Sequence, residues 1–157
     1  MKKNLFSLIL LLCAAALLLS ACGSKSESKA IPDMQKVFDA ITARVDLPEM
    51  AVVDGDRRFD LLGIDPADCR QAVTAICGDS VRADEIWLVE AVDADAAARV
   101  FEMAEVRVAQ KKQQLENYLP DQFAVVEKAV LLQENNAVVL FISPEAETML
   151  KLYRAGA

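Results

Sequence analysis

The side chains of this 157-residue sequence that could do chemistry are four cysteines and an excess of carboxylates. The sequence contains no histidine. Without an imidazole, the usual general base, the Ser-His-Asp and Cys-His arrangements and most zinc sites are excluded. The adjacent carboxylates Asp84 and Glu85 remain candidates for the acid and base of a small hydrolase. In so acidic a chain, solvated strand ends and helix caps are the favoured explanation. We therefore predict no catalytic residue and no metal site.

Cys22 stands at the end of an apolar leader, and its position indicates export from the cytoplasm. Residues 1–4 carry two lysines, residues 5–19 are almost wholly apolar, and small residues precede the cysteine. This order is the three-part plan of a bacterial export signal. A helix over residues 5–19 would be about 22 Å long, which falls short of the roughly 30 Å hydrocarbon core of a bilayer. The leader is therefore expected to be removed.

The sequence Leu19-Ser20-Ala21-Cys22 resembles the lipobox of bacterial lipoproteins. The resemblance implies cleavage between Ala21 and Cys22 after the cysteine sulfur has received a diacylglyceryl group, followed by N-acylation, for example with palmitate. A thiolate suits this reaction because it is a far stronger nucleophile than a serine hydroxyl. Two or three acyl chains also suffice for stable anchoring in a membrane, which a single chain does not. An uncleaved anchor helix or an ordinary signal peptide is the alternative.

The domain organisation follows from this leader. We expect a signal peptide over residues 1–21, a flexible Ser-rich tether over residues 22–30 and a single domain over residues 31–157. The domain would sit at the extracytoplasmic face of the cell membrane, held by lipid on Cys22 and by no other cofactor. Loss of Lys2 and Lys3 takes the net charge of −7 to about −9. So acidic a domain argues against nucleic acid and against anionic headgroups as partners.

Cys69 and Cys77 are the two cysteines that remain after Cys13 leaves with the signal peptide and Cys22 is lipidated. Outside the cytoplasm a disulfide is chemically allowed. Eight residues along a helix or a strand nevertheless separate the two α-carbons by about 12 Å or more, beyond the roughly 7 Å limit for a disulfide. We favour two buried thiols and keep a disulfide across a sharp chain reversal as the alternative.

Hydrophobic periodicity predicts a fold of the α+β class. Apolar residues spaced three and four apart indicate helices from Pro32 to before Pro48, over 93–119 with Pro120 as its end, and from Ser143 onward. Strands are expected over 85–92, 123–132 and 137–142, the last two joined by a hairpin turn at Gln133–Asn136. Residues 73–77 fit a strand or a helix, with a strand preferred. These elements make an antiparallel sheet of about four strands with the long and the C-terminal helix packed on it.

Several of these segments together are similar to a family of bacterial lipoproteins that carry a domain of unknown function. The similarity spans residues 31–155. It rests on Leu62–Pro66 and the residues that follow, on Val81–Ile86, on the long helix into Tyr118-Leu119-Pro120, and on the hairpin that ends with Val139–Ser143. The family implies no established activity, so no catalytic residue carries over.

Four side chains are the candidates for a binding surface. Arg107, Lys111 and Lys112 form a basic strip on the long helix that could hold an anionic polymer or lipid headgroup, and Trp87 could line a pocket. A solvated, salt-bridged helix and a core tryptophan are the structural alternatives for these residues. Residues 54–60, DGDRRFD, resemble a calcium loop superficially, but Arg and Phe stand where an oxygen ligand and the sharp turn are needed, so a capped turn is favoured.

The sequence therefore predicts a lipid-anchored, non-enzymatic binding or interaction module of the cell envelope. Its partners would be membrane lipid, through Cys22, and an envelope protein or polymer. Two alternatives remain open: a small envelope hydrolase that uses carboxylates, and a small-ligand carrier beside a transporter, which would need an enclosed apolar cavity.

Overall fold

The apolar run Ala137–Ile142 forms strand β5, and all six of its residues are buried, as the lack of polar alternation predicts. The computed structural model describes residues 30–156, so the expected signal peptide, the predicted lipidation site Cys22 and all of the tether before Ala30 lie outside the described residues. The helices are α2 (Met34–Arg44), α3 (Gly55–Leu62), α4 (Ala94–Leu115), α5 (Pro120–Glu127) and α6 (Ala146–Ala155), with a short 3-10 turn, η1 (Pro66–Asp68). The strands are β1 (Met50–Val52), β2 (Cys69–Cys77), β3 (Glu85–Ala91), β4 (Val130–Glu134) and β5.

The strands form one antiparallel sheet in the order β1-β2-β3-β5-β4. The α+β class is confirmed, but the sheet has five strands where about four were predicted. The additional strand is β1, three residues that pair with the end of β2 so that Met50 stands opposite Cys77. So short a strand has too few alternating residues to show a period of two in the sequence.

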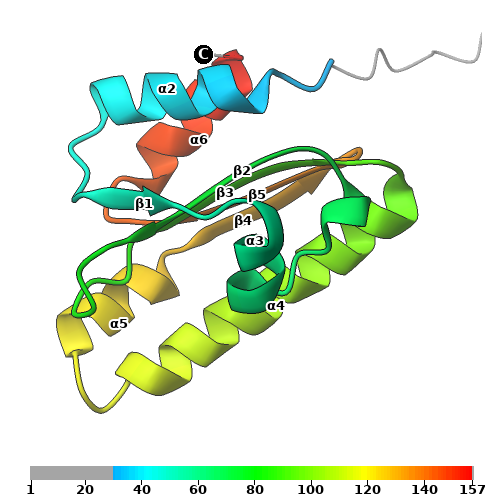
Figure 1. Ribbon diagram of the computed structural model, residues 1–157. Coiled ribbons are helices and arrows are strands. Elements are labelled where there is room, and N and C mark those ends of the chain that lie inside the picture. The colour runs from blue at the N-terminus through cyan, green and yellow to red at the C-terminus, as the bar shows by residue number, and fades with distance from the viewer. Residues whose placement is uncertain (1–29, 157) are drawn as a thin grey trace, which may run out of the picture.

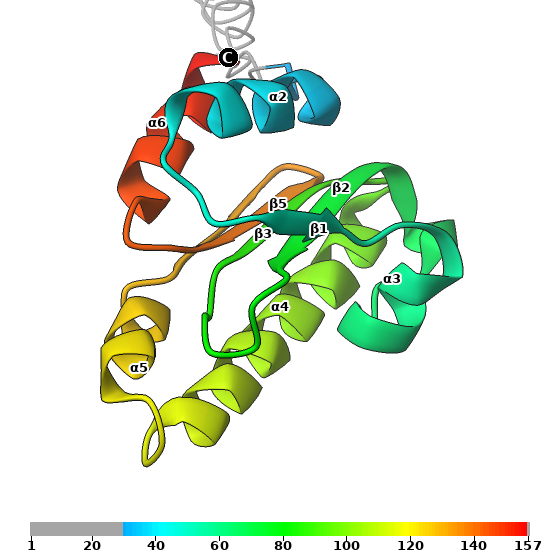
Figure 2. The same ribbon diagram turned by 60° about the vertical axis from the view of Figure 1, so that its left-hand side comes forward.

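Helices cover both faces of the sheet (Figure 1). Helices α2 and α6 lie on one face, and α4 lies on the other with α3 and α5 beside it (Figure 2). Alternation along β3 serves both layers, because Ile86 and Leu88 join the core beneath α2 and α6, whereas Trp87 and Val89 join the core against α4. No helix among residues 30–156 is long and apolar enough to cross a membrane.

Several predicted elements are confirmed by the structure. Asp33 caps α2 by accepting hydrogen bonds from the backbone N–H groups of Gln35 and Lys36. The predicted hairpin joins β4 and β5, but its turn is shorter than the predicted 133–136, because Gln133 and Glu134 pair within β4. Asn135 adopts a left-handed φ of 53° in that turn. Residues 73–77 belong to a strand, as preferred, and that strand begins earlier, at Cys69.

The predicted strand over 123–132 is wrong for residues 123–129. Pro120 does not end the long helix; it occupies the first turn of the separate helix α5, where a missing N–H costs nothing. The strand β4 begins only at Val130. The spacing of Tyr118 along the predicted helix 93–119 indicates a side chain that packs inward, but Tyr118 is 75% exposed in the connection between α4 and α5.

Candidate functional site

Glu85 is the first residue of β3, and its side chain is completely buried. The period of two along the strand sends it to the face on which Trp87 and Val89 pack against α4. A buried carboxylate is costly unless it is paired and hydrogen-bonded. The neighbouring helix must therefore supply positive charge.

Helix α4 supplies that charge from its own buried stripe. Ala97, Val100 and Ala104 are buried at spacings of three and four, and the same spacing continues to Arg107 and Lys111. Long cationic side chains can lie along apolar surface while their charged ends reach a distant partner. The basic strip predicted from the sequence thus faces inward at two of its three positions.

The resulting contacts saturate the carboxylate of Glu85. Arg107 donates from Nε to Oε1 at 3.0 Å and from Nη2 to Oε2 at 3.0 Å. Lys111 Nζ lies 2.9 Å from Oε2, and the indole Nε1 of Trp87 donates to Oε1 at 2.7 Å. Each carboxylate oxygen thus accepts from two different side chains. We name these four residues the Glu85 cluster.

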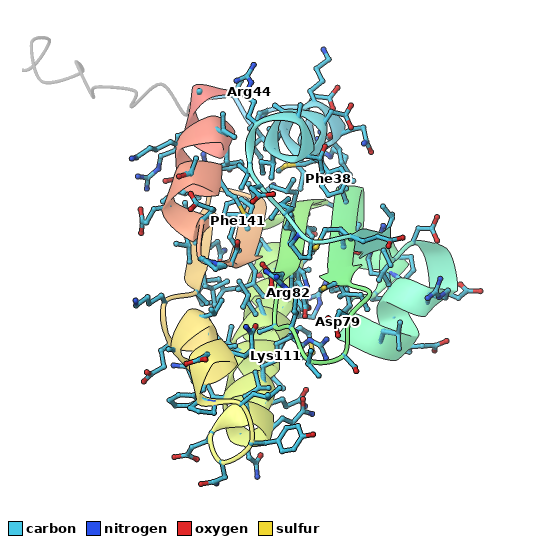
Figure 3. All side chains as sticks on the ribbon, turned by 90° about the vertical axis from the view of Figure 1, so that its left-hand side faces the viewer. Phe38, Arg44, Asp79, Arg82, Lys111 and Phe141 are labelled. Carbon is cyan, nitrogen blue, oxygen red and sulfur yellow. The ribbon has the colours of Figure 1, made fainter. Side chains whose placement is uncertain are left out.

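The Glu85 cluster also fixes the connection between β2 and β3. Lys111 Nζ donates to the carbonyl oxygen of Ala83 at 2.9 Å, and the Ala83 N–H donates to Gln122 Oε1 of α5 at 2.9 Å. Strand β3, helix α4 and helix α5 are therefore joined through one set of hydrogen bonds. Figure 3 shows Lys111 and Arg82 at this end of the molecule, away from Arg44 of α2.

The contacts of the Glu85 cluster support a structural role and leave little capacity for acid–base chemistry. Two cations face one anion, and the side chains of Arg107 and Lys111 are 23% and 13% exposed, while Glu85 has no exposure. A carboxylate with both oxygens doubly hydrogen-bonded has little capacity left to accept a proton from a substrate. Trp87, which the sequence offered as a candidate pocket residue, also has no exposed surface. The cluster orders the packing of α4 on the sheet.

Asp84 is buried beside Glu85, but it pairs with a different cation. Its side chain is 2% exposed, and Oδ2 lies 3.1 Å from Nε of Arg82. The second oxygen, Oδ1, has no hydrogen-bond partner in the structure. The hydrogen bond to Asp84 raises the pKa of the Arg82 guanidinium above its ordinary value. Asp84 and Glu85 are thus engaged by separate cations and do not form the open carboxylate pair that a hydrolase would need.

Lys112, the remaining residue of the predicted basic strip, lies apart from the Glu85 cluster. It lines a cleft of about 330 Å³ between α4 and the α5–β4 segment. Two carboxylates, Glu105 and Glu127, line the same cleft. The structure therefore does not bring the three basic residues together as one anion-binding strip.

A second candidate region, which we name the α3–η1 surface, was not predicted from the sequence. It comprises two adjoining clefts that share Asp65. One, of about 520 Å³, is lined by Asp56, Phe59, Asp60, Asp65 and Pro66. The other, of about 430 Å³, is lined by Gly63, Ile64, Asp65, Asp68, Arg99, Val100, Glu102 and Met103. The capped turn predicted over 54–60 is wrong, because α3 begins at Gly55 and gathers Asp56, Phe59 and Asp60 on a helix.

The two described cysteines are free thiols, so a disulfide between them is absent from the structure. They stand at the first and last positions of the nine-residue strand β2, which separates their α-carbons by about 26 Å. Both are half-buried. Burial raises the pKa of the Cys69 thiol above its ordinary value of 9.0, and Cys69 Sγ donates a hydrogen bond to the Asp65 carbonyl at 3.5 Å.

Among residues 30–156, no group of three or more Cys, Asp and Glu side chains is placed to hold a metal ion. The model of a family described as a domain of unknown function, DUF4358, matches residues 43–143, well over half of the chain. The matched span holds all five strands, helices α3 to α5, the Glu85 cluster and the α3–η1 surface. No curated protein and no solved structure matches the sequence.

Proposed function

This chain belongs to the DUF4358 family of domains of unknown function, and we propose that it is a lipid-anchored interaction module of a bacterial cell envelope. In this proposal the leader is removed before Cys22, acyl chains on that residue hold the protein to the outer side of the cytoplasmic membrane, and the domain binds an envelope protein. The activity is recognition without catalysis.

The anchoring part of the proposal rests on the leader. A positive start, an apolar stretch of about fifteen residues and small residues before Cys22 follow the order of an export signal. The acidic domain would gain little from contact with anionic headgroups, so its membrane affinity would have to come from acyl chains.

One observation carries the recognition part. Seven large apolar side chains are exposed among the described residues, and three of them, Val52, Phe59 and Leu61, fall within the ten residues 52–61. Exposed apolar surface among polar groups can mark an interaction site, and Phe59 is the member of this set that lines a cleft with carboxylates. The pairing of Asp84 and Glu85 with separate cations favours recognition over the hydrolase alternative.

The position of the chain entry supports the same arrangement. Ala30 and Gly156 line one small cavity, together with Tyr153 of α6, so the described chain begins beside the end of α6. Helix α3 and the corner between α4 and α5 lie on the opposite side of the sheet (Figures 1 and 2). An anchor that joins the domain at Ala30 would leave those elements accessible to a partner.

Photocrosslinking in intact cells tests the proposal. A photoreactive amino acid replaces one exposed residue at a time in the full-length chain: Phe59 of α3, Tyr118 between α4 and α5, or Lys151 of α6. We expect a covalent adduct with an identified envelope protein from at least one position, and loss of that adduct when Cys22→Ala is added. Absence of an adduct at every position, together with binding of a small molecule by the purified chain, would contradict the proposal and favour a carrier.

A further inference from the structure

Helix α3 presents nearly all of its surface to solvent. Leu62 is the only buried residue among its eight. The helix is held to the sheet by Arg58, whose Nη2 donates to the Ala72 carbonyl at 2.9 Å and whose Nε donates to Thr74 Oγ1 at 3.2 Å. Because one arginine and one leucine anchor it, the rest of the helix is free for a partner.

The exposed side of α3 carries a large aromatic ring among carboxylates. Phe59 is 54% exposed and lines the larger cleft of the α3–η1 surface with Asp56, Asp60 and Asp65. Asp56 and Asp60 are four residues apart and therefore lie on one face of the helix. The ring of Phe59 therefore forms part of the wall of this cleft.

The charges of the α3–η1 surface are not balanced from within. Its two clefts are lined by five carboxylates and one cation. That cation, Arg99, is already engaged, because its Nε donates to Asp68 Oδ2 at 3.0 Å as one part of a two-point ion pair. Asp56, Asp60 and Glu102 make no side-chain hydrogen bond or ion pair within the described chain, and the carboxylate of Asp65 accepts only from the Ala67 N–H. Arg57, the nearest cation in sequence, does not line either cleft.

We propose that the α3–η1 surface binds a basic segment of a partner protein, with a Lys or Arg side chain seated between Asp56, Asp60 and Asp65 and its stem or guanidinium on the ring of Phe59. The inference rests on the proposed interaction function and specifies its surface and partner chemistry. A cation over an aromatic face is attracted by the ring, and the surrounding carboxylates select positive partners and speed their encounter. The apolar stem of the same side chain covers the exposed ring.

Binding of defined peptides tests the inference. The full-length chain in a non-ionic detergent is titrated against fluorescein-labelled octa-arginine, with octaglutamate as the negative probe, and binding is followed by fluorescence anisotropy. We expect the paired variant D56N/D60N to weaken octa-arginine binding about fivefold, because two exposed charge contacts are lost. Phe59→Ser is expected to weaken it about threefold.

A matched control separates this surface from the overall negative charge. The variant D46N/E147Q also removes two exposed carboxylates, one after α2 and one on α6, so it changes the net charge equally and leaves α3 intact. Its affinity for octa-arginine is expected to stay within about twofold of the unchanged protein. Equal loss in this control, binding that Phe59→Ser leaves unaffected, or no octa-arginine binding at all would overturn the inference.

Crosslinking distinguishes failure of this inference from failure of the proposed function. If the chain is an interaction module that uses another surface, adducts form from position 118 or 151 and not from position 59. If it is not an interaction module, adducts form from none of the three. Adducts from position 59 with an identified protein, at a basic segment of that protein, are the result that the inference predicts.

Discussion

At the scale of single residues, Glu85 shows how a buried charge specifies the packing of a helix on a sheet. Its carboxylate accepts from Trp87, Arg107 and Lys111 and has no exposed surface. The sequence contained a signal for this arrangement. Glu85 begins the alternating set that includes Trp87, and Lys111 interrupts the apolar stripe of α4. Opposite charges placed within two apolar faces that pack together indicate an ion pair in the core.

Removal of the negative charge should therefore destabilise the fold strongly. In Glu85→Gln, Arg107 and Lys111 would remain largely buried without a counter-charge, and we expect the free energy of unfolding to fall by about 3 kcal/mol. The value lies at the low end for a broken buried pair because both cations keep some exposure to solvent. Urea unfolding followed by circular dichroism measures the change.

The control for this prediction is an ion pair on the surface. Glu134 lies 3.5 Å from Arg154, and the two side chains are 45% and 54% exposed. Glu134→Gln is expected to cost less than about 1 kcal/mol. Equal losses in the two variants would show that the Glu85 cluster behaves as a surface pair.

Cys69 gives a prediction about pH. Burial raises the pKa of its thiol, and its S–H donates to the Asp65 carbonyl, so the folded protein favours the protonated form. The stability that this preference contributes is present below the unfolded-state pKa and is lost as the pH rises through the folded-state pKa. Alkylation by iodoacetamide, measured in a Cys77→Ser variant, should reach half of its maximal rate at higher pH in the native protein than in urea. The same midpoint in both states would show that the thiol is not protected.

At the scale of elements, some helix ends can be predicted from the sequence and others cannot. A glycine after a short apolar run, such as Gly63 after Leu62, indicates the end of a helix, and Gly63 ends α3 with a left-handed φ of 73°. Pro120 was predicted to end a helix, but it begins one, because proline is compatible with either position in a sequence. Helix α5 is only eight residues long and has one buried residue, so its periodicity is too brief to be distinguished from that of the strand that follows.

Two glycines in the same conformation give a matched test of helix ends. Gly63 and Gly156 both follow helices with φ near 75°, but a β-carbon at Gly63 would lie 3.2 Å from Sδ of Met103, and one at Gly156 would meet nothing within 4 Å. We expect Gly156→Ala to cost about 1 kcal/mol for the left-handed backbone. Gly63→Ala should cost about 2 kcal/mol, because the contact with Met103 is added.

A double-variant cycle isolates that contact. In a Met103→Ala background, the cost of Gly63→Ala should fall to about that of Gly156→Ala, since only the backbone term remains. Thermal unfolding of the four proteins provides the comparison. An unchanged cost of Gly63→Ala in the Met103→Ala background would contradict the role assigned to this close approach.

The candidate site was only partly predictable, for a reason that also belongs to this scale. The sequence places Arg107, Lys111 and Lys112 on one helix, but it does not say which face of that helix meets the sheet. The structure turns Arg107 and Lys111 inward and leaves Lys112 beside another cleft. The α3–η1 surface could not be predicted because its residues come from two segments, 56–68 and 99–103, which are brought together only by the packing of the fold.

At the scale of the whole molecule, the two faces of the sheet carry separate layers of helices. The chain enters beside α2 and α6, and the family match covers the sheet and the opposite layer of α3, α4 and α5. In the proposed arrangement the first layer faces the anchor and the second faces the partner. The α3–η1 surface would then act at the side of the molecule that the tether leaves uncovered (Figure 2).

The central claim, attachment through lipid on Cys22, has one direct measurement, which is the intact mass of the chain extracted from its own cells. We predict a polypeptide that begins at Cys22 and carries the added mass of a diacylglyceryl group and an N-acyl chain, and we predict that Cys22→Ala accumulates as the uncleaved precursor. A chain of 157 residues with an unmodified Cys22 would contradict the account.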